Sequence, residues 1–269
     1  MSETIPEEPS SEDPEEDSDE DSDEDSDENP NQDSDSVADT RWLDGYAASF
    51  SSSSTSELYR FAYGDVELVG QVSANGADVQ LTDIALATDG TIYGSSFGEL
   101  FIIDPTTGEA ETVAAFTTGS VNALAVLPDG QLLAADLGGK VSLVDPSTAE
   151  QTPLLSYPFG LTSSGDIVAM PNGTIYATAT DSTVDHLVAI DVAAGTAELV
   201  VENLPDDVYG LMVSSTGGLY GLTYATATGL CNLGEVIRID LAAGSYKSDE
   251  CLAFSPGGAA SGDPLTARR

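Results

Sequence analysis

LTDIALATDGTIYG, residues 81–94, is the first of four related stretches that decide the fold of this chain. VNALAVLPDGQLLA (121–134), GDIVAMPNGTIYA (165–177) and YGLMVSSTGGLYG (209–221) repeat its order of two short apolar runs around a turn. Aligning the stretches on their turn glycine places Gly90, Gly130, Gly173 and Gly217 at spacings of 40, 43 and 44 residues. A third apolar run follows each turn and ends in an aspartate: Asp104, Asp145, Asp191 and Asp240. The sequence therefore contains four copies of one structural unit.

Each copy has the composition of β-strands. Runs of four or five residues rich in Ile, Val and Leu, separated by Asp-Gly, Asn-Gly or Pro-containing turns, are typical of strands. The turn glycine tolerates a positive φ that other residues resist. The aspartate after the third run accepts hydrogen bonds from backbone amides further along the chain and so stabilises the next turn. Each copy thus predicts four strands of an antiparallel sheet.

Recurring four-stranded sheets with no helical periodicity predict an all-β fold, a single β-propeller. The segment ECLAFSPGGAASG (250–262) places Gly258 a further 41 residues after Gly217, so it supplies a first strand and its turn. Residues 45–72 match strands two, three and four of a copy that has no first strand of its own. Pairing the C-terminal strand with these N-terminal strands closes the ring and removes its open edge. We predict five four-stranded blades, with six as the alternative.

The charge distribution divides the chain into two parts. Residues 1–40 contain 19 of the 47 acidic residues and no Lys or Arg, which predicts a disordered, low-complexity acidic tail. Residues 41–269 form the propeller domain and still carry a net charge of 7 − 28 = −21. Such a field repels nucleic acid and favours cations and basic partners. No run of apolar residues approaches the ~18 residues needed to span a bilayer, and we expect a monomer.

The two cysteines bear on the compartment. Cys231 and Cys251 lack the spacing of metal ligands and of a CxxC motif. Their places in the repeat put both on the same face of neighbouring blades, which favours a disulfide over two buried thiols. A disulfide favours export to the periplasm, cell surface or medium. Because residues 1–40 lack the pattern of a secretory signal, export implies a leader absent from this chain, and a cytoplasmic location is the alternative.

Candidate site residues come from the expected mouth of the channel, where the innermost strands begin. Asp83, Asn122, Asp166 and Glu250 occupy these strand starts and have the oxygen ligands that Ca²⁺ prefers. Tyr209 begins another innermost strand, and further acids lie in adjacent loops. The acids of these loops are Asp136, Asp181, Asp185, Asp206 and Asp207. We predict Ca²⁺ binding by the first set, and ligand binding by Tyr209, Asp136, Asp185 and His186, with the histidine in a solvated loop.

The motifs of residues 124–130 (LAVLPDG) and 102–108 (IIDPTTG) resemble those of the bacterial β-propellers that include the YVTN-, NHL- and gluconolactonase-like repeat proteins. The resemblance extends over about residues 44–258 and implies the propeller fold. It also implies an alternative function, a Ca²⁺-dependent lactonase-like hydrolase that uses the channel mouth. The leading hypothesis is a non-enzymatic, exported or surface-tethered binding module. Its expected partner is a protein, a carbohydrate or a small molecule.

Overall fold

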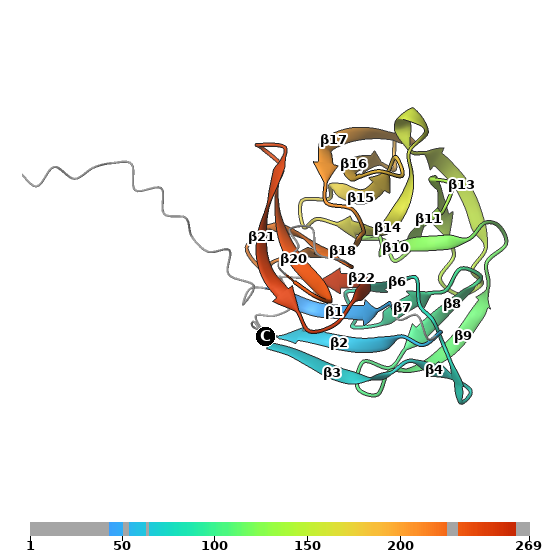
Figure 1. Cartoon of the computed structure of the whole chain (residues 1–269). Helices are drawn as coiled ribbons and strands as arrows, with labels where there is room; N and C mark the ends of the chain where they lie inside the picture. Colours follow the sequence, from blue (N-terminus) through green and yellow to red (C-terminus); the bar gives the residue numbers. More distant parts are fainter. Residues whose placement is uncertain (1–42, 51–53, 63–64, 225–230, 262–269) are drawn as a thin grey trace, which may run out of the picture. The chain divides into compact units, whose positions relative to one another are not determined.

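The predicted strand and turn units form separate four-stranded sheets. The computed structural model describes residues 43–50, 54–62, 65–224 and 231–261, and Figure 1 shows their sheets arranged as blades around a common centre. Within these residues there are five blades, so the chain is an all-β five-bladed β-propeller. The predicted acidic tail, residues 1–40, lies outside the described residues.

The blades are numbered along the ring, and the strands of each are given from the centre outward. Blade 1 comprises β22 (Pro256–Ser261), β1 (Asp44–Ser49), β2 (Glu57–Ala62) and β3 (Asp65–Gln71). Blade 2 comprises β6 (Asp83–Leu86), β7 (Ile92–Ser95), β8 (Glu99–Ile103) and β9 (Glu109–Ala115), and is extended by β4 (Ser73–Ala74) and β5 (Ala77–Asp78). Blade 3 comprises β10 (Val121–Val126), β11 (Leu132–Asp136), β12 (Lys140–Val144) and β13 (Gln151–Ser156).

The last two blades follow the same order. Blade 4 comprises β14 (Thr162–Ala169), β15 (Ile175–Thr180), β16 (Asp185–Asp191) and β17 (Thr196–Leu204), and a short 3-10 turn, η2 (Pro158–Gly160), precedes it. Blade 5 comprises β18 (Val208–Val213), β19 (Leu219–Thr223), β20 (Gly234–Asp240) and β21 (Ser245–Leu252). Apolar side chains such as Leu124, Leu187 and Leu211 fill the space between adjacent blades and are fully buried.

The turn chemistry predicted from the repeat is confirmed. The four turn glycines have φ values between 84° and 91°, a conformation that side chains with a Cβ resist. The aspartates after the third strands accept hydrogen bonds from backbone amides of the following turn. These bonds are Thr106 N to Asp104, Ser147 N to Asp145, Ala194 N to Asp191 and Ala242 N to Asp240, at 2.7–3.0 Å.

The ring closes as predicted, by pairing of the C-terminal strand with the N-terminal strands. β22 pairs antiparallel with β1, with Ala259 opposite Ala47 and Gly258 opposite Ala48. In Figure 1 the red β22 lies beside the blue β1 near the centre of the ring. Blade 1 therefore combines the two ends of the chain, which gives β1 a partner on its inner edge.

The register of this terminal segment differs from the prediction. The first strand is β22 itself, so Gly258 lies inside a strand and is not a turn glycine. A Cβ on Gly258 would lie 2.5 Å from Oδ1 of Asp83, so only glycine permits this approach of β22 to the neighbouring blade. The preceding residues complete blade 5 instead, and Phe254 stacks on Tyr59 with ring centroids 4.1 Å apart. The spacing of 41 residues reproduced the repeat length but not the function of the glycine.

Cys231 and Cys251 form the predicted disulfide. Its position differs from the prediction, because Cys251 lies near the end of the outermost strand β21 and not at the start of an innermost strand. The bond joins the residues before β20 to β21 within blade 5, at the point where the chain crosses to β22. Closing a loop of 20 residues stabilises the fold by about 3 kcal/mol.

Candidate functional site

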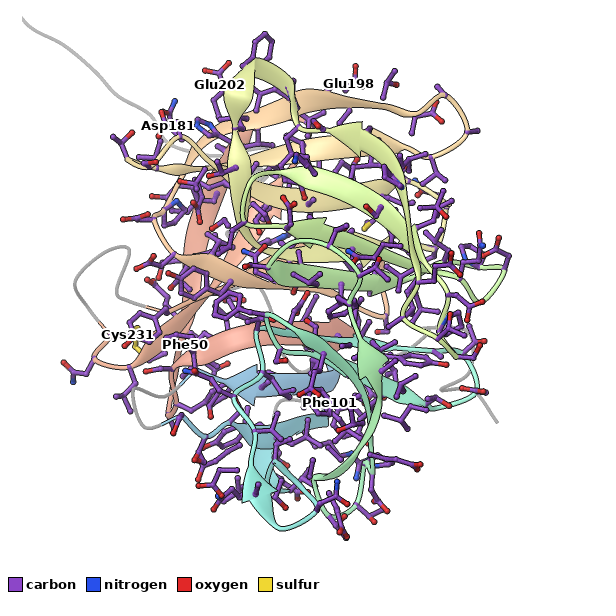
Figure 2. The ribbon with its side chains drawn as sticks, turned by 90° about the vertical axis from the view of Figure 1, so that its right-hand side faces the viewer. Phe50, Phe101, Asp181, Glu198, Glu202 and Cys231 are labelled. Atoms are coloured by element: carbon purple, nitrogen blue, oxygen red, sulfur yellow. A yellow bond between two sulfur atoms is a disulfide. The ribbon has the colours of Figure 1, made fainter. Side chains whose placement is uncertain are left out.

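A pocket of about 340 Å³ opens on the propeller axis and is lined by all five blades. Innermost strands contribute their first residues, and the loops between second and third strands contribute the rim. The lining residues are Phe50, Thr82, Phe97, Asn122, Leu137, Ser163, Ser164, Gly165, Thr180, Ser182, Asp185, Asp206, Asp207, Tyr209 and Gly257. This is the mouth predicted from the repeat. In the side view of Figure 2, Phe50, Asp181 and Cys231 all lie toward this face, on the left.

Aromatic rings form one wall of the pocket. Phe50 lies 6.3 Å from Tyr209 and 5.9 Å from Tyr224 between ring centroids, and the two tyrosine rings are 6.0 Å apart. The rings are tilted or edge-to-face, which is the favoured geometry for aromatic pairs. The three rings support one another, so the wall is held in place from blades 1 and 5.

Carboxylates adjoin the aromatic wall. Asp206 is exposed and Asp207 is half-buried, and both lie in the connection that leads into β18. The Tyr209 hydroxyl donates a hydrogen bond of 2.6 Å to Asp207. Burial, together with this hydrogen bond and the charge of Asp207, raises the pKa of Tyr209. No Lys or Arg lies among the lining residues, so the pocket offers negative charge beside aromatic faces.

Asn122 contributes an unpaired acceptor. Its side chain is only 6% exposed, and its Nδ2 donates a hydrogen bond of 3.2 Å to the carbonyl of Ser163. Its Oδ1 is buried and has no partner among the described residues. A buried acceptor without a donor costs about 1–3 kcal/mol, so a donor supplied by a ligand would be favoured.

Asp185 is a buried carboxyl group at the wall between blades 4 and 5. It is 1% exposed, and its Oδ2 accepts hydrogen bonds of 2.5 Å from the Ser164 hydroxyl and 2.7 Å from the Val208 amide. Burial raises its pKa to about 6, although the hydrogen bonds from Ser164 and Val208 act in the opposite direction. The pocket therefore gains a negative charge as the pH rises through about 6.

This shift predicts a pH dependence of stability. The folded protein holds the Asp185 proton up to about pH 6, whereas the unfolded chain releases it near pH 3.8. The stabilisation is complete below the unfolded pKa and is lost as the pH rises through the folded one, an effect of about 3 kcal/mol. Urea unfolding of Asp185→Asn and of the wild type at pH 5 and 8 measures the last part of this loss, about 1.4 kcal/mol. We expect a smaller fall in stability in the variant, and equal falls would contradict the assignment.

Asp83 and Asp166 directly follow Thr82 and Gly165, which line the pocket. Each of the two carboxyl groups links neighbouring blades. Both are fully buried. Oδ2 of Asp83 accepts a hydrogen bond of 2.6 Å from the Leu124 amide in β10. Oδ2 of Asp166 accepts one of 2.5 Å from the Leu211 amide in β18 and one of 3.2 Å from the Ala259 amide in β22. Together the two carboxyl groups join the innermost strands of all five blades, and we call them the central carboxyl pair.

Burial disfavours a negative charge on the central carboxyl pair. Burial raises the pKa of both groups well above the usual range, and the charge of Asp166 raises that of Asp83 further. For Asp166, the hydrogen bonds from the Leu211 and Ala259 amides act in the opposite direction to burial. Oδ1 of Asp166 is buried and has no hydrogen-bond partner among the described residues.

The structure separates the four residues predicted to bind Ca²⁺. Asp83, Asn122 and Asp166 lie near the axis, but Glu250 lies on the outermost strand β21, opposite Val236 of β20. The reason is the register of the terminal segment, which places β22, and not residues 250–254, on the axis. Among the described residues no group of three or more His, Cys, Asp or Glu is arranged to hold a metal ion.

Of the four predicted ligand-binding residues, two line the pocket and two do not. Tyr209 and Asp185 line the pocket. Oδ1 of Asp136 accepts hydrogen bonds from the amides of Gly138 and Lys140, so this side chain shapes the loop that carries Leu137. His186 lies in β16 and is 7% exposed, so its expected position in a solvated loop is wrong. Its Nδ1 accepts a hydrogen bond of 3.4 Å from the Asn203 amide, and its Nε2 lies 3.7 Å from Asp181.

Sequence reasoning did not assign Phe50, Phe97 or Leu137 to the site. Phe97 and Leu137 stand alone in polar loops, GSSFGE and ADLGGK, directly after the second strands of their blades. A single exposed apolar residue in a loop that faces the channel is the signal that could have identified both. Phe50 precedes a serine run whose residues 51–53 lie outside the described part, and no spacing marks it.

A larger hollow of about 920 Å³ lies at the turn ends of blades 3 and 4. Two of its carboxylates, Asp129 and Asp191, accept hydrogen bonds from turn amides, and the third, Glu198, lies on β17. Asp129 accepts the Gln131 amide, and Asp191 accepts the Ala194 amide. This hollow has neither an unpaired buried acceptor nor an aromatic wall, so the axial pocket is the better candidate despite its smaller volume.

Fold and pocket together define a five-bladed β-propeller with an acidic and aromatic axial site. No protein-family model matches the chain, and no curated protein matches it significantly in sequence. Among solved structures, the chain is similar to a protein of unknown function from Bacteroides thetaiotaomicron, with a TM-score of 0.53 and 12% identity, covering 80% of this chain and 61% of that one.

Two further solved structures are similar in fold. One is the extracellular domain of a proposed one-component system from B. thetaiotaomicron (TM-score 0.46, 13% identity, 79% of this chain and 32% of that one). The other is the WD40 β-propeller domain of Doa1 (TM-score 0.45, 18% identity, 66% and 57%). This chain spans less than two thirds of each of these three proteins. At such identities the likeness concerns the fold alone, and it does not single out the YVTN-, NHL- and gluconolactonase-like group.

No helix among the described residues has the length and apolar character needed to cross a membrane.

Proposed function

We propose that this protein is a non-enzymatic binding protein whose axial pocket accepts an organic cation, an ammonium or guanidinium group. The observation that carries the proposal is that the polar groups available to a ligand in the pocket are hydrogen-bond acceptors, and that most of them are carboxylates. Asp206 and Asp207 present carboxylates, and the buried Oδ1 of Asn122 lacks a donor among the described residues. A group that only donates hydrogen bonds complements such a set.

The aromatic wall supports the same ligand class. A cation within about 6 Å of an aromatic centroid is attracted by the ring face, an effect worth about 1–2 kcal/mol. Phe50 and Tyr209 line the pocket together with the carboxylates. A guanidinium or ammonium group would thus contact ring faces and carboxylates at once, whereas an anion would meet unfavourable charge.

The experiment compares N-acetyl-arginine amide with N-acetyl-citrulline amide, which has nearly the same shape without the charge. Titration calorimetry should show the arginine compound binding at least about tenfold more tightly, because charge-assisted hydrogen bonds and the cation–π contact are lost with citrulline. The affinity for the arginine compound should also rise between pH 5 and 7.5 as Asp185 ionises.

Two variants locate the binding. Asp207→Asn removes one charge and suits the backbone, because Asp207 has a φ of 61° and asparagine tolerates this conformation. Glu111→Gln removes the same charge from an exposed position on β9, outside the pocket lining, and is the matched control. We expect weaker arginine binding in the first variant alone. Equal losses in both variants, or equal affinity for citrulline, would refute a specific cation site.

Export or surface tethering is part of the proposal. The disulfide in blade 5 and the strong net acidity support it. The Ca²⁺-dependent lactonase alternative stays a prediction, and the described geometry adds no ligand set in its favour. A calcium titration, followed by a lactone hydrolysis assay with and without chelator, tests that alternative in the same samples.

A further inference from the structure

Exposed apolar side chains gather beside the axial pocket. Phe97 and Leu137 line its rim and are 44% and 48% exposed. Phe159, in the η2 turn between blades 3 and 4, is 86% exposed. All three belong to connections on the face where the innermost strands begin, and we call them the apolar arc.

Backbone hydrogen bonds join the connections that carry the apolar arc. The Val121 amide donates to the Phe97 carbonyl at 3.2 Å, and the Leu137 amide donates to the neighbouring Ser120 carbonyl at 2.9 Å. The Tyr157 amide donates to the Gly139 carbonyl at 2.8 Å, which ties the β11–β12 loop to the η2 turn. The three connections that carry the apolar arc are therefore hydrogen-bonded to one another in series, from the pocket rim to the η2 turn.

The backbone holds Phe159 in its exposed position. It lies between Pro158 and Gly160 with a φ of 58°, in the left-handed region that a phenylalanine rarely adopts. The turn is closed by a hydrogen bond of 3.0 Å from the Leu161 amide to the Pro158 carbonyl. An exposed aromatic side chain on a strained, hydrogen-bonded turn is a feature typical of contact surfaces.

Charge indicates what can cover this surface. Asp206 and Asp207 lie on the side of the pocket formed by blade 5, and Asp181, 46% exposed, lies in blade 4. The acidic segment 1–40 of this chain contains no Lys or Arg, so it does not complement these carboxylates. A second copy, with a formal net charge of −40, is opposed for the same reason. A basic polypeptide is complementary.

We propose that the partner of this face is an extended segment of a basic polypeptide. One Arg or Lys side chain enters the axial pocket, and neighbouring apolar side chains of the segment rest on the apolar arc. This inference rests on the proposed cation site and extends it from a small group to a polypeptide. In an extended segment alternate side chains point to the same side, so apolar residues two and four positions from the basic one face the arc.

Two peptides test the proposal. Both are acetylated and amidated nonapeptides with a central arginine and glycine at alternate positions, and the remaining four positions are leucine in one and serine in the other. Because the leucines occur on both sides of the arginine, the direction of the bound segment does not matter. We expect the leucine peptide to bind at least about tenfold more tightly than the serine peptide.

The arc variant is Phe97→Ser/Leu137→Ser/Phe159→Asn, in which asparagine suits the positive φ. The matched control, Val66→Ser/Leu68→Ser/Leu241→Ser, removes three other exposed apolar side chains, from β3 and from the turn after β20. Thermal unfolding checks that both are folded. The arc variant alone should lose the preference for leucine over serine.

The outcomes separate the two proposals. Equal binding of both peptides, or equal loss of the leucine preference in both variants, would overturn the polypeptide partner and leave the cation site intact. A leucine peptide with central citrulline that binds as tightly as the arginine one would show an apolar partner and overturn the proposal. Failure of N-acetyl-arginine amide to bind would refute the cation site itself. A dimer in sedimentation that only the arc variant dissociates would identify a second copy as the occupant and also overturn it.

Discussion

A chain that ends at Ser255 is expected to lose cooperative unfolding altogether. It keeps the disulfide and every strand of blades 2 to 5, but it lacks β22, the innermost strand of blade 1. β1 then exposes its inner edge, and Asp166 loses the hydrogen bond from the Ala259 amide. Since domains are stable by only about 5–15 kcal/mol, loss of an innermost strand exceeds what the ring can tolerate. Urea unfolding followed by circular dichroism measures the transition.

Two further chains make this experiment decisive. Deletion of residues 262–269 alone leaves β22 in place and serves as the control, with an unchanged midpoint. In a circular permutant, residues 256–261 precede Asp44 through a short loop and the chain ends at Ser255. Because Ser261 pairs with Gly45, the joined strands form a hairpin, and we expect stability to return. A sharp transition in the chain that ends at Ser255 would refute the role of β22 in closing the ring.

Substitution of Asp166 by alanine is expected to lower the free energy of unfolding by about 3–5 kcal/mol. The change leaves the Leu211 and Ala259 amides without their buried acceptor, and an unsatisfied buried amide costs about 1–3 kcal/mol. It also leaves a cavity at the axis, where the side chain is fully buried. Chemical denaturation at pH 7 provides the measurement.

Asp166→Asn is the matched variant. Its carbonyl can accept from both amides, and its side chain carries no charge at any pH. The folded pKa values of the pair are raised, so the pair stabilises the fold below its unfolded pKa and loses that contribution as the pH rises through the folded values. We expect Asp166→Asn to resist alkaline unfolding better than the wild type. An Asn variant as unstable as the Ala variant would contradict the role of Asp166 as a buried, uncharged acceptor of both amides.

Much of the fold could be predicted because its determinants are local. A turn needs a glycine that tolerates a positive φ, and Gly90 and Gly173 recur for this reason. The turn after a third strand needs an acceptor for its amides, and Asp104 supplies it. Such requirements recur at the repeat length, so the blade count, the closure and the mouth of the channel followed from spacing.

The contents of the site depended on contacts between blades. Asp83 and Asp166 occupy equivalent positions, seven residues before Gly90 and Gly173, and their strand starts suggested metal ligands. In the structure they accept hydrogen bonds from amides of other blades, and the charge of Asp166 raises the pKa of Asp83, a coupling between residues 83 positions apart that no local pattern encodes. Glu250 was assigned to the channel mouth because Gly258 was interpreted as a turn glycine. A repeat spacing cannot distinguish a turn glycine from one required by close packing, and Glu250 lies on the outermost strand β21.

The sequence by itself determined that this chain forms a propeller, which ends join and which face bears the pocket, and it favoured five blades over six. These features rest on backbone conformations and strand lengths that neighbouring residues dictate. The tertiary structure decided that a carboxyl pair joins the innermost strands at the axis, that Asn122 keeps a free acceptor, and that Phe97 and Leu137 line the same pocket as Asp207. Those features arise only when five blades meet, because burial and electrostatic coupling depend on which strands the closed ring brings together.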